Sequence, residues 1–126
     1  MTISEKKRVL VVCPDERLGE IRCMILHSHG YDALCVNSPE VARRTWAPGA
    51  YQLILVDVQS DPDTALSLCD EFKSKDDTQL VALMSQHHIY IPPSACPDEV
   101  IPKAEGPRVF VQKVKELLEG AAEARS

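Results

Sequence analysis

Short apolar runs alternate along the chain with stretches in which apolar residues recur every three or four positions. The runs predict five β-strands, at 8–13, 31–36, 51–57, 79–85 and 98–103. The intervening stretches predict helices, at 15–30, 37–49, 61–75 and 106–120. Strands that alternate with helices favour right-handed βαβ units, so the pattern predicts a parallel sheet with helices on both faces.

Residues at the helix boundaries and on one helix face support these assignments. Ser38 and Asp61 are each followed by proline, which is the expected sequence of a helix cap and first helical residue, and Gly30 is a plausible stop for the first helix. The side chains expected to face the core follow helical spacing: Leu18, Ile21, Ile25, Leu26, Leu66, Cys69, Phe72, Phe110, Val114, Leu117 and Leu118.

Length and composition indicate one globular domain. The chain has 126 residues, of which 44% are hydrophobic, enough for a single core. We expect an N-terminal tail at 1–7, the domain at 8–120 and a C-terminal tail at 121–126. The net charge of −5 argues against nucleic acid or an anionic membrane as a partner. The polar N-terminus and the lack of a long apolar run lead us to expect a cytoplasmic protein.

Four residues with chemically useful side chains are expected where predicted strands end. A doubly wound sheet with strand order 2-1-3-4-5 would place Cys13, Asp57, Ser85 and Lys103 at its carboxyl edge, where such folds bind ligands. Asp57 directly follows a buried apolar strand, and a charge there is costly unless it is paired or hydrated. The simplest interpretation is that Asp57 pairs with Lys103 and is partly hydrated.

With these positions identified, the sequence resembles a response-regulator receiver (CheY-like) domain, the phosphoacceptor module of two-component signalling. Asp57 in "LILVD" matches the phosphoacceptor, Ser85 in "ALMS" the hydroxyl residue that ends strand 4, and Lys103 in "IPK" the lysine that ends strand 5. The resemblance implies a flavodoxin-like α/β fold and a signalling module that is not an enzyme. Its implied partner is a signalling protein, either a histidine kinase or a downstream effector.

The sequence departs from this family where the family binds Mg²⁺. The two acids that usually follow strand 1 are replaced by Cys13 and Pro14, and neither side chain is a good ligand for an ion that prefers oxygen. Asp15 comes one position later and is expected to cap the first helix instead. We therefore expect Mg²⁺ binding to be weak or absent.

The segment 86–97, where the family carries helix 4, is also altered. Pro92, Pro93 and Pro97 interrupt it, so helix 4 is expected to be short or missing. Ile89, Tyr90 and Ile91 precede these prolines. They are interpreted either as part of a partner-binding surface, together with the start of the last helix, or as a cover for the core end that helix 4 would otherwise protect.

These features favour an atypical, stand-alone receiver domain that acts by protein–protein interaction, as a monomer or weak homodimer, with little or no control by phosphorylation. One alternative keeps Asp57 as a slowly phosphorylated acceptor. A second is a thiol or metal sensor at Cys13. In the thiol sensor, Lys103 would activate Cys13; in the metal sensor, Cys13, Asp57, His87 and His88 would bind a metal such as zinc. The wide spacing of the cysteines predicts no disulfide framework or zinc motif: Cys13, Cys23, Cys35, Cys69 and Cys96.

Overall fold

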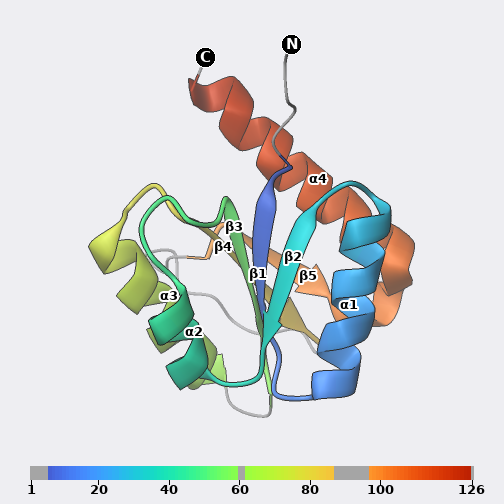
Figure 1. The fold of residues 1–126 in the computed structure, drawn as a ribbon, viewed down its shortest axis with the longest axis horizontal. Helices are drawn as coiled ribbons and strands as arrows, with labels where there is room; N and C mark the ends of the chain where they lie inside the picture. The colour runs from blue at the N-terminus through green and yellow to red at the C-terminus, as the bar shows by residue number, and fades with distance from the viewer. Residues whose placement is uncertain (1–5, 60–61, 87–96, 126) are drawn as a thin grey trace.

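The protein is built on a five-stranded parallel sheet, as seen in a computed structural model that describes residues 6–59, 62–86 and 97–125 (Figure 1). The strands are β1 (Arg8–Val12), β2 (Asp32–Val36), β3 (Leu53–Asp57), β4 (Leu80–Ser85) and β5 (Glu99–Pro102). The helices are α1 (Glu16–Ser28), α2 (Pro39–Thr45), α3 (Pro62–Lys75) and α4 (Gly106–Arg125), the last preceded by the 3₁₀ turn η1 (Lys103–Glu105).

The strand order is β2-β1-β3-β4-β5, which confirms the predicted fold class. In the register of the sheet, Val9 of β1 lies beside Ala33 of β2 on one side and Leu53 of β3 on the other. The chain therefore runs outward from β1 to β2 and then crosses back to β3. The carboxyl ends of β1 and β3 are neighbours at this switch in direction, where doubly wound sheets place their ligand crevice.

Helices cover both faces of the sheet, and each face has its own apolar cluster. Helices α2 and α3 lie on one face and α1 and α4 on the other (Figure 1). Trp46 and Phe72 pack in the first cluster, with ring centroids 5.0 Å apart, and Phe110 and Val114 pack in the second. Every residue of β3 is buried because the strand is covered on both faces, which explains its continuous apolar sequence.

The predicted helix boundaries agree with the structure at three points. The Ser38 hydroxyl accepts a hydrogen bond from the Val41 amide at 3.2 Å, and Asp15 Oδ1 accepts one from the Leu18 amide at 3.1 Å. Gly30 follows the end of α1 with φ of 89°, a left-handed conformation that favours glycine. The last helix differs from the prediction, because α4 continues to Arg125 rather than ending at residue 120.

The inner face of α1 differs from the one predicted. Its buried residues are Gly19, Arg22, Cys23 and Leu26, whereas Ile21 was expected in the core and is 47% exposed. The buried set follows helical spacing, but it includes a glycine and an arginine that a search for apolar residues does not count. The predicted faces of α3 and α4 agree better, since Cys69, Phe72, Phe110, Val114 and Leu118 are all buried.

Two further expectations from the sequence concern helix 4 and membrane-spanning segments. The predicted absence of a long helix at 86–97 falls almost entirely outside the described residues. Among the helices of the described residues, none has the length and apolar character needed to cross a membrane.

Candidate functional site

The structure brings the predicted site residues to one edge of the sheet. Cys13 directly follows β1, Asp57 ends β3, Ser85 ends β4, and Lys103 directly follows β5. Asp57 lies beside Met84 in the register, one residue before Ser85. Parallel strands end at the same edge, so this arrangement follows from the topology.

Three donors hold the carboxylate of Asp57. Lys103 Nζ lies 2.7 Å from Oδ1, and Arg22 Nη1 lies 2.5 Å from Oδ2. Gln59 Nε2 also donates to Oδ1, at 2.5 Å. The Asp57 side chain is only 1% exposed, in contrast to the partial hydration expected from the sequence. Two cations therefore face one buried anion, and both of its oxygens are engaged.

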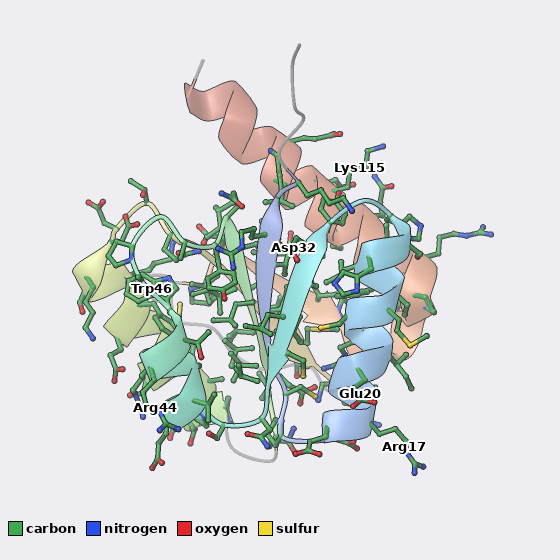
Figure 2. All side chains as sticks on the ribbon, in the orientation of Figure 1. Arg17, Glu20, Asp32, Arg44, Trp46 and Lys115 are labelled. Carbon is green, nitrogen blue, oxygen red and sulfur yellow. The ribbon has the colours of Figure 1, made fainter. Side chains whose placement is uncertain are left out.

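Arg22 is the residue of this candidate site that sequence reasoning missed. It lies on the inner face of α1, and its side chain is 7% exposed. Arg17 of the same helix extends away from the sheet, as is ordinary for a surface arginine (Figure 2). A buried guanidinium requires a partner. The signal was present in the helical spacing of Gly19, Arg22, Cys23 and Leu26, read together with an unexplained carboxylate at the end of β3.

The thiol of Cys13 lies against this ion pair. Arg22 Nη1 is 3.5 Å from its sulfur, and the thiol makes a longer contact of 3.9 Å with Asp57 Oδ2. It also donates to the carbonyl of Asp15 at 3.3 Å. Burial is the main cause that raises the pKa of Cys13, and Asp57 adds to the increase while Arg22 opposes it. The cation in contact with this thiol is thus Arg22, whereas the sensor alternative had assigned an activating role to Lys103.

Lys103 and Ser85 complete the edge. Lys103 is 18% exposed and donates a second hydrogen bond to the carbonyl of Val58, at 2.9 Å. This bond anchors the ammonium group to the chain that leaves β3. The side chain of Ser85 is buried at the end of β4.

A pocket of about 280 Å³ opens beside Asp57, on the face covered by α2 and α3. Its lining is mostly apolar and consists of Val12, Pro14, Pro39, Val56, Asp57, Gln59, Thr64, Ala65 and Leu68. A second hollow, of about 170 Å³, lies on the opposite face between α1 and the start of α4. Leu18, Ile21 and Ile25 line one side of it, and Pro107 and Phe110 the other.

Several predicted residues lie outside the described part of the chain. These are the candidate metal ligands His87 and His88 and the candidate interface residues Ile89, Tyr90 and Ile91. Among the described residues, no group of three or more His, Cys, Asp or Glu side chains is arranged to hold a metal ion. Cys69 is disulfide-bonded, which the cysteine spacing did not predict.

Comparison with known proteins gives no match to a family model and no significant match to a curated protein, but it gives matches to solved structures. A response regulator receiver domain protein (CheY-like) from Methanospirillum hungatei has a TM-score of 0.82 at 19% identity, and the match covers 95% of this chain and 99% of that one.

Two further matches point to the same fold. The response regulator TrrA from Thermotoga maritima, solved with Mg²⁺–BeF, has a TM-score of 0.78 at 24% identity, over 88% of this chain and 98% of that one. An orphan response regulator of H. pylori has a TM-score of 0.73 at 22% identity, over 89% and 96% of the two chains. The sheet order, the helices on both faces and these matches agree, and the chain has the fold of the response-regulator receiver domains.

Proposed function

We propose that this chain is an atypical receiver module that binds another signalling protein with little or no control by phosphorylation of Asp57. The observation that carries the proposal is the pair of cations on a carboxylate that is 1% exposed. A carboxylate that attacks a phosphodonor needs a free oxygen and an open approach. Here Arg22 engages Oδ2, and Lys103 and Gln59 engage Oδ1.

The residues around Asp57 also do not suit Mg²⁺. Cys13 and Pro14 offer no side-chain oxygen at the end of β1, and the Asp15 carboxylate caps α1. The Arg22 guanidinium already supplies a positive charge at Oδ2 of Asp57, next to the Cys13 thiol. Mg²⁺ requires hard oxygen ligands in near-octahedral geometry. We therefore propose that the site works without this ion.

An exposed apolar surface supports the proposal that the function is binding. Ile21 and Met24 on α1 are 47% and 68% exposed, and Ile21 lines the hollow between α1 and α4. Pro107 and Phe110 of that hollow belong to the start of the last helix, which sequence analysis included in the partner surface. Among the matching structures is a complex of the histidine kinase ThkA with the response regulator TrrA, with a TM-score of 0.77 at 24% identity. A signalling protein is therefore the partner that we propose.

The phosphorylation part is tested by intact-mass analysis after incubation with millimolar Mg²⁺ and acetyl phosphate. We expect an unchanged mass, and an NMR spectrum that Mg²⁺ and beryllofluoride do not alter. An added phosphate that peptide mapping assigns to Asp57 would instead support the alternative of a slowly phosphorylated regulator.

The binding part is tested on a partner isolated by affinity capture and then purified. We expect its affinity to be the same with and without Mg²⁺ and acetyl phosphate. Ile21→Glu and Met24→Glu should weaken binding, whereas Leu34→Glu, at a position 44% exposed on β2, is the matched control. Tyr90→Ala tests the predicted contribution of residues 89–91. Unchanged affinity in the Ile21, Met24 and Tyr90 variants would rule out this surface.

A further inference from the structure

Three free thiols lie in the apolar cluster on the face of the sheet that α1 covers, and two of these cysteines border Gly19. Cys13 follows β1, Cys23 lies on α1 and Cys35 lies on β2. A Cβ atom placed on Gly19 would lie 2.1 Å from the sulfur of Cys35 and 3.4 Å from the Cβ of Cys13. The missing side chain of Gly19 therefore provides the space in which the Cys35 thiol packs against α1.

Cys23 and Cys35 form a close pair within this group. Cys23 lies one helical turn after Gly19, on the same face of α1. Cys23 and Cys35 belong to the same apolar cluster. Each thiol also affects the pKa of the other, which places the two side chains near each other at the boundary between α1 and β2. Cys23 is 7% exposed, whereas Cys35 is half-buried.

From this arrangement we propose that Cys23 and Cys35 are a modification site, at which a small peroxide forms a reversible disulfide that links α1 to β2. Glu16 and Glu20 lie near enough to Cys35 to act on its charge. Their carboxylates disfavour anionic oxidants such as glutathione disulfide and leave small neutral peroxides as the suitable class.

The reaction balances with hydrogen peroxide as oxidant. The Cys35 thiolate attacks one peroxide oxygen, the O–O bond breaks, and the leaving hydroxide takes up the thiol proton as water. The resulting Cys35 sulfenic acid is then attacked by Cys23, an S–S bond forms, and the departing hydroxide takes up the Cys23 proton as a second water. Two thiols are oxidised by two electrons, and one peroxide is reduced to two waters.

The environments of the two thiols assign their roles. Burial raises the pKa of both, and that of Cys23 reaches about 12. The neighbouring Cys23 thiol and the charge of Arg22 oppose the increase in the pKa of Cys35. Cys35 is thus the thiol that reacts with the oxidant, since it is more exposed and ionises more readily, and Cys23 is the resolving thiol. The reaction is slow at neutral pH and becomes faster as the pH rises.

The proposal is tested by mass spectrometry of one tryptic peptide that contains both cysteines. Trypsin cleaves after Arg22 and Arg43, and the resulting peptide 23–43 contains Cys23 and Cys35 and no other cysteine. The protein is treated with hydrogen peroxide in native buffer, its remaining thiols are alkylated in denaturant, and the digest is analysed by mass spectrometry. We expect a peptide 23–43 that carries no alkyl group, is lighter by two hydrogens, and regains both thiols with dithiothreitol.

Matched variants decide whether the native geometry is responsible. Cys23→Ser and Cys35→Ser should each abolish the lighter peptide, whereas Cys13→Ser should retain it. Gly19→Ala should lower its yield, because the added methyl group displaces the Cys35 sulfur. The proposal is overturned if wild-type peptide 23–43 stays doubly alkylated, if Cys35 proceeds to sulfinic acid, or if Cys35 pairs with Cys13. These outcomes are read from the wild-type protein, so they do not depend on any variant folding.

Discussion

Arg22 and Asp57 are 35 residues apart in the chain, yet the guanidinium of one lies 2.5 Å from the carboxylate of the other, with both side chains shielded from solvent. The pair joins α1 to the carboxyl end of β3. Lys103, which follows the edge strand β5, contacts the other oxygen of the same carboxylate. One side chain therefore connects three elements of the fold, and this connection is the basis of the first two predictions.

Asp57→Asn is expected to destabilise the protein strongly. The substitution leaves the buried Arg22 without a counter-charge, a change that typically costs about 3–5 kcal/mol in the free energy of unfolding. The matched control is Asp32→Asn, which removes an exposed 3.6 Å pair with Arg8 and should cost at most about 1 kcal/mol. Urea denaturation followed by circular dichroism measures both. Equal costs for the two variants would show that the buried pair contributes no more than a surface pair.

Arg22 and Asp57 are expected to be energetically coupled. Asp57→Leu leaves the buried Arg22 without its counter-charge, and Arg22→Met leaves the buried Asp57 with Lys103 as its remaining cation. The double variant removes both charges of the Arg22–Asp57 pair at similar volume. The double variant should therefore be more stable than the sum of the single effects predicts, by about 1–3 kcal/mol. Arg17→Met combined with Asp57→Leu is the control, because Arg17 is exposed and its effect should simply add. Additivity in both cycles would contradict the coupling.

The inner face of α1 shows what the sequence could predict and what it could not. Helix caps such as Ser38 depend on local sequence, and the strand order follows from the fold class that alternating strands and helices favour; both were predicted correctly. The cluster at the ends of the strands was also anticipated, because topology alone brings Asp57 and Lys103 together. The partner role of Arg22 depends on which way α1 is rotated against the sheet. That rotation is decided by a long-range contact rather than by the apolar pattern of the helix itself.

Stability is expected to fall with increasing pH above about 9. The pKa of Cys23 rises from 9.0 to about 12 in the folded protein, so the unfolded chain releases this proton first. Between these values the unfolded state binds fewer protons than the native state, and stability decreases by at most about 1.4 kcal/mol per pH unit for this group. Urea denaturation at pH 8, 9 and 10, values that are about one unit either side of an ordinary thiol pKa, measures the slope. Cys23→Ala should flatten it, and an identical slope in both proteins would refute the assignment.

Gly19→Ala is expected to be destabilising even though alanine favours helices. The new Cβ would lie 2.1 Å from the Cys35 sulfur, and overpacking of this kind costs about 1–3 kcal/mol, more than the gain of up to about 1 kcal/mol in helix propensity. Cys35→Ala should restore most of the loss by removing the sulfur. Gly120→Ala is the control, since its Cβ meets nothing within 4 Å, and it should stabilise the protein. A stabilising Gly19→Ala would show that Cys35 repacks without strain.

The buried pair also limits how this sequence can change over time. Replacement of Arg22 alone removes one of the two cations that balance the buried Asp57, and replacement of Asp57 alone leaves the buried Arg22 without a counter-charge. Either single substitution gives a less stable protein, so we expect positions 22 and 57 to covary among relatives of this chain. Ile21, beside Arg22 on α1 but turned towards solvent, is under no such constraint.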